Sequence, residues 1–172
     1  MVRNNGSRGI PLKLTVWYHT PGCVGPSILF LRRLSYPRSC SGQARTFDPG
    51  SIMTVLIVED NDGIRRLLRR ALFETASIVL ECRDGADALD AYTRHRPDVV
   101  LMDVRMPRLD GLTATRQIRQ FDPSAKIVIV TDYDDDDLRA AAVEAGACDY
   151  ALKQNLAVLP VLIRSVGGMR KA

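Results

Sequence analysis

The sequence predicts a doubly wound α/β domain built on a five-stranded parallel sheet. Short apolar runs alternate five times with segments of helical periodicity between residue 53 and about residue 170. Several runs are apolar at every position, which is typical of strands covered on both faces. The runs also stop abruptly at polar or charged residues, as in the stretch Asp98–Gly111, where four apolar residues lead into Asp103. Such alternation favours parallel strands joined by crossover helices.

Length and charge divide the chain into two unequal parts. The 172 residues, 46% of them hydrophobic, suffice for one ordinary domain and an appendage. The net charge of +4 is unevenly distributed along the chain. Residues 1–52 contain seven Lys and Arg residues and one acid, Asp48, whereas residues 53–172 contain seventeen Lys and Arg residues and nineteen Asp and Glu residues. The basic character therefore belongs to the appendage and says little about the domain.

Residues 1–52 show no sustained periodicity and are predicted to be a disordered extension. A basic arm that contacts nucleic acid is one alternative. A metal site at His19, Cys23 and Cys40 is another, although their spacing fits no common zinc pattern. Met53 directly precedes the first strand, which makes it a candidate for the natural start and the extension a candidate artefact of start-site choice.

The cysteines and the apolar runs indicate in which cellular compartment the chain is expected. The four cysteines show no paired metal spacing, and Cys82 and Cys148 fall in strand-like runs that suit small buried thiols. This pattern favours a reduced, cytosolic chain. No apolar run reaches the length of a membrane-spanning helix.

The first half of the domain is expected to contain three strands and two helices. A buried strand at Val55–Val58 is followed by a helix that Asn61 or Asp62 caps. A second helix ends before Pro97, because the residue before a proline disfavours the helical conformation. The predicted inward positions are Ile64, Leu67, Leu68, Ala71 and Leu72 in the first helix, Ile78, Leu80 and Cys82 in an alternating strand, and Ala88, Leu89 and Tyr92 in the second helix.

The second half is expected to contain three helices and two strands. A short helix covers residues 111–120, and a strand at Ile127–Val130 ends in Thr131. Gly146 closes the next helix, and Pro160 fits only in the first turn of the last one. A fifth strand covers Cys148–Leu152 and ends in Lys153. The predicted inward positions of the three helices are Leu112, Thr115 and Ile118 in the first, Leu138, Ala141, Ala142 and Ala145 in the second, and Leu159, Leu162, Ile163 and Val166 in the last.

Three carboxylates are predicted to meet at one point of the sheet. In the flavodoxin-like strand order 2-1-3-4-5, ligand sites lie beyond the carboxyl ends of the first and third strands. Those strands end in Glu59, Asp60 and Asp103. Neighbouring carboxylates raise one another's pKa, and a divalent cation removes their repulsion. Because oxygen ligands with room for water favour Mg²⁺ over Ca²⁺, the sequence predicts a magnesium site.

Two further strand ends complete a site for phosphoryl transfer to a carboxylate. Thr131 adds a hydroxyl after the fourth strand, and Lys153 adds an ammonium after the fifth. In this chemistry Asp103 attacks, Mg²⁺ and Lys153 neutralise the phosphoryl oxygens, and Thr131 donates to one of them.

From residue 53 to near the end, the chain resembles a bacterial two-component response-regulator receiver domain. The matching pieces are Val58-Glu59-Asp60-Asn61, the stretch from Asp103 to Gly111, Thr131, and Tyr150-Ala151-Leu152-Lys153. The resemblance implies that Asp103 is the phosphoacceptor and that Asp60 and Asp103 bind Mg²⁺ directly. It also implies that the Arg105 backbone carbonyl is a third ligand and that Glu59 acts through water.

The same resemblance implies roles for the remaining site residues and for the partners. Lys153 binds the phosphoryl group, and Thr131 and Tyr150 form the conformational switch. The phosphate comes from a histidine kinase or a histidine phosphotransfer protein, and a downstream protein partner responds to the switch. The chain is expected to be a cytoplasmic signalling protein rather than an enzyme, with no direct contact to nucleic acid or membrane.

Two positions depart from the family pattern. Gln154 follows Lys153, where the family often has Pro, so the lysine is expected to approach the site slightly differently. Asp132 follows Thr131, where a small residue is usual, and it adds negative charge near an incoming phosphate. The run Asp134–Asp137 is expected at a helix N-terminus, where the helix dipole favours acids.

The sequence leaves two other functions open. A phosphatase with an Asp nucleophile would need a second acid two residues after Asp103, where Arg105 stands and cannot serve as an acid. A binding module that is never phosphorylated is favoured only by Asp132 and Gln154. No output domain follows the last helix before Ala172, so we expect either a stand-alone receiver or a chain that was cut or frameshifted.

Overall fold

The computed structural model describes residues 52–168. Apart from Ile52, the predicted disordered extension lies outside the described residues. So do the two alternatives placed on it, a nucleic-acid-binding arm and a metal site at His19, Cys23 and Cys40. Among the described residues, no helix combines the length and the apolar character that crossing a membrane requires.

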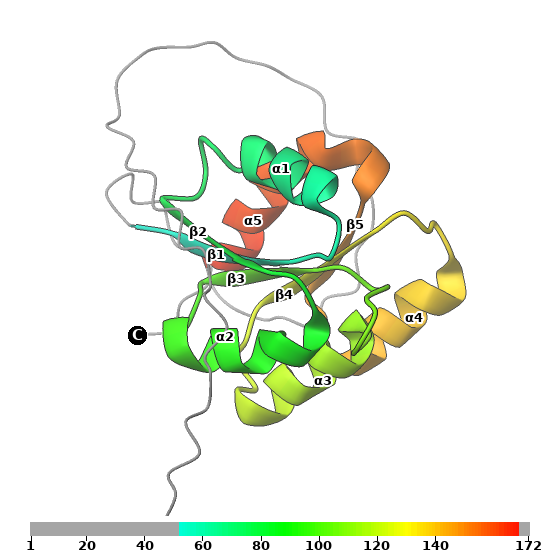
Figure 1. The fold of residues 1–172 in the computed structure, drawn as a ribbon. Coiled ribbons are helices and arrows are strands. Elements are labelled where there is room, and N and C mark those ends of the chain that lie inside the picture. The colour runs from blue at the N-terminus through cyan, green and yellow to red at the C-terminus, as the bar shows by residue number, and fades with distance from the viewer. Residues whose placement is uncertain (1–51, 169–172) are drawn as a thin grey trace, which may run out of the picture.

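A five-stranded parallel sheet forms the centre of the structure (Figure 1). Its strands are β1 (Thr54–Val58), β2 (Ile78–Cys82), β3 (Val99–Met102), β4 (Ile127–Thr131) and β5 (Asp149–Leu152). They pair in the order β2-β1-β3-β4-β5, and every pair is parallel. This confirms the flavodoxin-like order that the sequence predicts.

Helices cover both faces of the sheet (Figure 1). One face is covered by α1 (Asp62–Ala71) and α5 (Leu159–Gly167). The other is covered by α2 (Ala88–His95), α3 (Gly111–Phe121) and α4 (Asp136–Ala145). Two 3₁₀ helices were not predicted, η1 (Gly85–Asp87) and η2 (Lys153–Val158), because such short turns carry no amphipathic period.

Strand β1 shows why the strands carry continuous apolar runs. Leu56 and Val58 pack in the cluster that includes α2, α3 and α4, whereas Val55 and Ile57 pack in the cluster that includes α1 and α5. Successive side chains of a strand point to opposite faces. A strand covered on both faces must therefore be apolar at every position, and these four residues are fully buried.

Short polar side chains begin the helices that follow the strand ends. Asn61 caps α1, Asp110 caps α3 and Asp135 caps α4, each by accepting hydrogen bonds from backbone N–H groups of the first turn. The run Asp134–Asp137 therefore lies at a helix N-terminus, as predicted. Gly146 closes α4 with a φ of 95°, in the left-handed region that glycine adopts without strain.

Two side chains lie elsewhere than predicted. Leu67, predicted on the inner face of α1, is 51% exposed. The buried side of α1 includes Arg65 and Leu68, and with about 100° of rotation per residue Leu67 falls beyond its edge. Cys148 was predicted to be buried, but it is half-buried because it lies just before β5 rather than inside it.

The first residue of α3 lies unusually close to the end of β3. A Cβ atom added at Gly111 would lie 1.8 Å from the backbone oxygen of Asp103, a distance that no pair of non-bonded atoms tolerates. Glycine at this position therefore allows α3 to begin directly against the backbone of Asp103.

We expect Gly111→Ala to lower the free energy of unfolding by about 2 kcal/mol or more, because the backbone at Asp103 must shift. Urea unfolding measures this loss. Gly63→Ala is the matched control, since a Cβ there meets only the Asn61 side-chain oxygen, at 3.0 Å. Its expected change is under about 1 kcal/mol, because alanine is the better helix former. Equal losses in the two variants would contradict the role given to this close approach.

Candidate functional site

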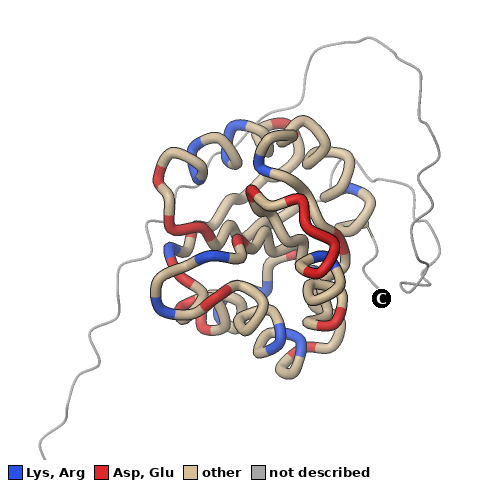
Figure 2. Tube along the Cα trace, turned by 90° about the vertical axis from the view of Figure 1, so that its right-hand side faces the viewer, with Lys and Arg blue, Asp and Glu red and all other residues tan. Residues whose placement is uncertain are grey.

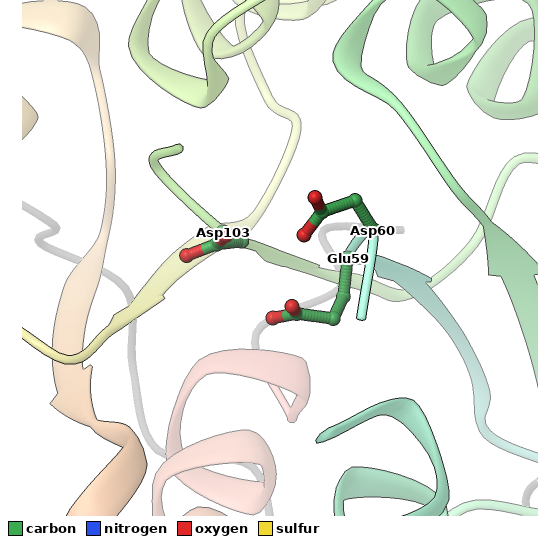
Figure 3. A group of neighbouring side chains, drawn as sticks. All are labelled: Glu59, Asp60 and Asp103. Atoms are coloured by element: carbon green, nitrogen blue, oxygen red, sulfur yellow. The ribbon is translucent and has the colours of Figure 1, made fainter. Parts of the chain in front are cut away.

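The ends of β1 and β3 bring three carboxylates together (Figure 3). Val58 pairs with Met102, so Glu59 and Asp103 continue neighbouring strands side by side. The Asp103 amide donates a hydrogen bond of 2.9 Å to the Val58 carbonyl. Oxygen atoms of Glu59, Asp60 and Asp103, one from each, all lie within 4.8 Å of one another. The structure thus brings together the three acids that the sequence predicts at the switch point.

The chemistry of these three residues fits a divalent cation. Glu59 and Asp103 are buried, whereas Asp60 is exposed. Burying like charges side by side is costly unless a cation compensates for them. The donors are all oxygens, and the exposed position of Asp60 leaves one side of the cluster open to water. Such a donor set suits Mg²⁺, which usually keeps several of its waters.

Lys153 lies beside two of the acids from the other half of the sheet. Its Nζ is 2.7 Å from Oε2 of Glu59 and 3.0 Å from Oδ1 of Asp103. The lysine side chain is 7% exposed, so these ion pairs are shielded from water. Thr131 of β4 pairs with Leu152 of β5, and this register places Lys153 one residue beyond the edge of the sheet. The Lys153 ammonium therefore places a positive charge in the buried part of the site.

Burial and mutual charge shift the pKa values of these groups. Burial raises the pKa of Glu59, and the nearby Asp103 charge raises it further. Burial likewise raises the pKa of Asp103, with a smaller contribution in the same direction from Asp60. Burial alone would lower the pKa of Lys153, but the hydrogen bond to Glu59 and the charge of Asp103 outweigh it, so this pKa is raised. The lysine therefore stays protonated beside two carboxyls that hold their protons more readily than usual.

Arg105 lies in the loop after β3, and its side chain contacts Tyr133. It is exposed, and its guanidinium carbon lies 4.1 Å from the centre of the Tyr133 ring. This contact joins the loop after β3 to the loop after β4. The role predicted for Arg105 uses its backbone carbonyl and leaves its side chain free for this contact.

Thr131 and Tyr150 lie on the α4 side of the sheet. Thr131 is two residues beyond Ile129, which pairs with Tyr150, so the two side chains share a face. In the described part of the chain, the buried Thr131 hydroxyl accepts a hydrogen bond from the Tyr133 amide at 3.4 Å rather than contacting Asp103. The Tyr150 hydroxyl donates to the Tyr133 carbonyl at 2.5 Å, and its ring packs under Arg139. Tyr133 therefore lies between the two predicted switch residues.

The two positions that depart from the family pattern lie at the mouth of the site. Asp132 is 61% exposed, and its Oδ2 lies 3.8 Å from Nζ of Lys153. Gln154 is exposed, and Lys153 reaches Asp103 with glutamine as its neighbour. Figure 2 shows that acidic residues follow one another along the loop into α4, Asp134–Asp137 among them. Asp132 therefore adds negative charge on the exposed side of Lys153.

Two polar residues near the site were not predicted. Asp84 is buried and accepts hydrogen bonds from the amides of Arg108 at 3.0 Å and Leu109 at 3.2 Å, which fixes the loop after β3. The dipeptide Asp84-Gly85 is a turn signal that could have indicated such a role. Arg65 is buried next to the loop after β1. The sequence could have indicated this, because Arg65 is a charged residue on the side of the helix that carries the buried Leu68.

Comparisons with known proteins agree with this arrangement. The family model of the response regulator receiver domain matches residues 55–163. Response regulator MprA of Mycobacterium sp. strain KMS is 40% identical over 115 residues, which cover 64% of this chain and 50% of that protein. Chemotaxis protein CheY of Halobacterium salinarum is 39% identical over 99 residues, covering 58% of this chain and 82% of that protein.

A solved structure of a response regulator is also similar to this chain. The crystal structure of a two-component response regulator of the LuxR family from Aurantimonas sp. SI85-9A1 superposes with a TM-score of 0.64 at 32% identity, covering 71% of this chain and 89% of that one. The chain spans about half the length of the MprA relatives that it matches. Because the family model covers more than half of the chain, the chain belongs to the response-regulator receiver-domain family, the phosphoacceptor modules of two-component signalling.

Proposed function

We propose that phosphorylation of Asp103, dependent on Mg²⁺, switches the conformation of a partner-binding surface on this chain. The observation that carries the proposal is the grouping of Asp103 with Glu59, Asp60 and Lys153, where two further acids and one lysine surround the buried carboxylate of Asp103. The phosphoryl donor is a histidine kinase or a histidine phosphotransfer protein. The switched surface binds a downstream protein partner rather than nucleic acid or a membrane.

The chemistry follows from the positions of the side chains. An oxygen of Asp103 attacks the phosphorus atom, and the phosphorus–nitrogen bond of the donor breaks as the new phosphorus–oxygen bond forms. Lys153, already 3.0 Å from Asp103, offsets charge on the phosphoryl oxygens. Asp60, Asp103 and the Arg105 carbonyl would hold Mg²⁺ directly, with Glu59 acting through water. When bound, the ion would neutralise the transferring group and orient it for in-line attack.

The proposal also extends to the organisation of the chain. We propose that residues 53–172 form the receiver domain and that residues 1–52 are not needed for its fold. Among the described residues the buried core begins at Met53, directly before β1, and this side chain packs in the cluster that includes α1 and α5. The buried Cys82 thiol is free, which suits a reducing compartment, and we propose the cytoplasm. In this role the chain receives a phosphoryl group once per signal and does not turn over a substrate.

Asp103→Asn should abolish phosphoryl incorporation, because the amide is a poor nucleophile and a weaker metal ligand. Incubation with acetyl phosphate and Mg²⁺, followed by intact-mass measurement, detects the added phosphoryl group. Asp132→Asn is the matched control, since Asp132 is also an acid near Lys153 but is exposed and 3.8 Å away. The control should retain incorporation. Full incorporation in Asp103→Asn would show that another residue is the acceptor.

Asp60→Asn should weaken Mg²⁺ binding by about tenfold or more, because the affinity of such sites depends on the number of charged ligands. Amide shifts in a magnesium titration followed by NMR give the dissociation constant. Asp90→Asn is the control, since Asp90 lies on α2 and pairs with Arg94 rather than with the site. An unchanged dissociation constant in Asp60→Asn would remove this residue from the metal site.

Thr131→Ala should still accept phosphate on Asp103 but lose most of the conformational response. A hydrogen bond from the Thr131 hydroxyl to a phosphoryl oxygen is worth about 1.5–3 kcal/mol, enough to shift two states of similar energy. Hydrogen exchange across α4, β5 and α5, with and without beryllofluoride, measures the response. Thr131→Ser should retain it, because the hydroxyl remains. An undiminished response in the alanine variant would take the switch role away from Thr131.

A further inference from the structure

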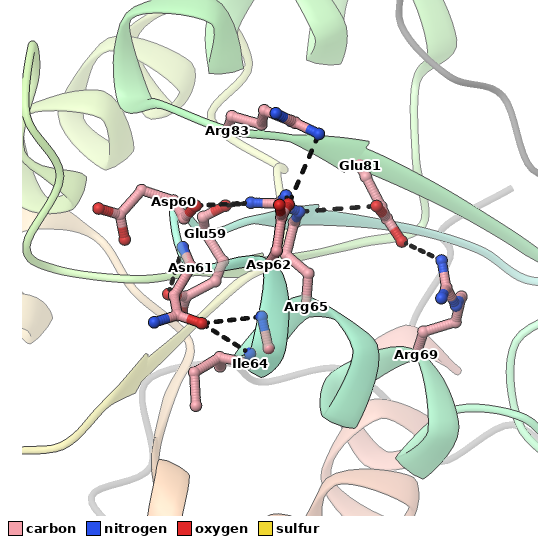
Figure 4. Close-up of polar contacts among 10 residues, drawn as sticks. Glu59, Asp60, Asn61, Asp62, Ile64, Arg65, Arg69, Glu81 and Arg83 are labelled. Carbon is pink, nitrogen blue, oxygen red and sulfur yellow. Dashed lines mark hydrogen bonds and ion pairs between the residues drawn. The ribbon is translucent and has the colours of Figure 1, made fainter.

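Arg65 places a guanidinium directly beneath the loop that carries two of the acids (Figure 4). Its side chain is only 3% exposed, although it belongs to α1, a helix with a solvent-facing side. Its Nη1 donates hydrogen bonds to the backbone carbonyls of Glu59 at 2.6 Å and of Asp60 at 2.9 Å. One nitrogen thus holds the carbonyls of two successive residues, which are both part of the acid cluster.

The rest of the guanidinium is oriented to suit these two hydrogen bonds. Its Nη2 forms an ion pair with Asp62 at the start of the same helix. Its Nε lies 3.6 Å from Glu81, which is too long for a hydrogen bond, while Arg69 binds Glu81 at 2.8 Å. Pairing with Glu81 therefore does not account for the position of Arg65, whereas the carbonyls of Glu59 and Asp60, together with the Asp62 carboxylate, do.

The two carbonyls lie where the chain turns out of the sheet toward the site. Upstream, the Glu59 amide donates to the Cys82 carbonyl at 3.1 Å, which ends the pairing with β2. Downstream, the Asn61 amide donates to the Glu59 carboxylate at 3.2 Å. Between these points Arg65 fixes both peptide groups, and with them the directions in which the side chains of Glu59 and Asp60 leave the backbone.

Arg65 affects cation binding through two opposed effects. As a positive charge near the acids it would repel a metal ion, but Asp62 and Glu81 offset that charge. As a donor it fixes the backbone of the acids, and Mg²⁺ requires ligands close to octahedral positions. Because Asp62 and Glu81 offset the charge, we expect the geometric effect to dominate. A lysine could not reproduce the whole arrangement, because its single nitrogen cannot bind the two carbonyls and also take the place of Nη2 beside Asp62.

We propose that Arg65 is a positioning residue for the metal site, acting through its hydrogen bonds to the Glu59 and Asp60 carbonyls. This inference rests on the proposed function, since it assumes that the acid cluster binds Mg²⁺. Residues that orient metal ligands without touching the metal change its affinity by about 10–100-fold when removed. We expect a loss of that size when the guanidinium is removed.

The test compares Arg65→Gln and Arg65→Lys with Arg69→Gln in the full chain. Arg69 lies on the same helix and binds the same Glu81, but it contacts neither carbonyl. Each variant is titrated with Mg²⁺ and followed by NMR amide shifts, and its free energy of unfolding is measured in urea. We expect the dissociation constant to rise about tenfold in both Arg65 variants and by less than about twofold in Arg69→Gln.

The outcomes separate the inference from the function on which it rests. If the unaltered chain does not bind Mg²⁺, the proposed metal site is wrong. If it binds and both folded Arg65 variants bind within twofold of it, Arg65 is only structural and the inference fails. An equal loss in Arg69→Gln would also overturn it, as would failure of both Arg65 variants to fold. A loss confined to Arg65 variants, whatever their stability relative to Arg69→Gln, supports the positioning role.

Discussion

The burial of Glu59 and Asp103 beside one another is the constraint on which the site depends. Two carboxylates with exposed fractions of 1% and 5% would repel each other strongly in a medium of low polarity. Lys153, itself buried, compensates for part of that charge through ion pairs to both. Asp60 adds a third acid at the water-facing side, so one lysine cannot neutralise the cluster. The remaining demand for positive charge is the physical basis for the cation that we propose at this cluster.

The fold could be predicted because the sheet is covered on both faces. Val55–Val58 and Ile127–Val130 are apolar at every position, and each run stops where the chain leaves the core. The rotation of α1 about its axis was less predictable. Apolar spacing alone placed Leu67 inside, whereas the buried side of the helix includes Arg65, whose hydrogen bonds go to backbone carbonyls and so leave no mark in the apolar pattern. The 3₁₀ helix that begins at Lys153 left no periodic signal.

Much of the candidate site could be predicted because its residues directly follow strands. Glu59, Asp103 and Lys153 each take the first position after a strand, and parallel register brings such positions together. Residues in the loops could not be located in this way. That the Thr131 hydroxyl binds the Tyr133 amide depends on the path of the loop after β4, and no periodicity encodes that path.

The position of Tyr133 has a consequence for how the loop before α4 can move. Its ring stacks with Arg105, its carbonyl accepts from Tyr150, and its amide donates to Thr131. Contacts from the loop after β3, from the end of β4 and from within β5 thus meet in one residue. Any displacement of Tyr133 therefore acts on Arg105, Thr131 and Tyr150 together, which couples the loop before α4 to the loop after β3 and to β5.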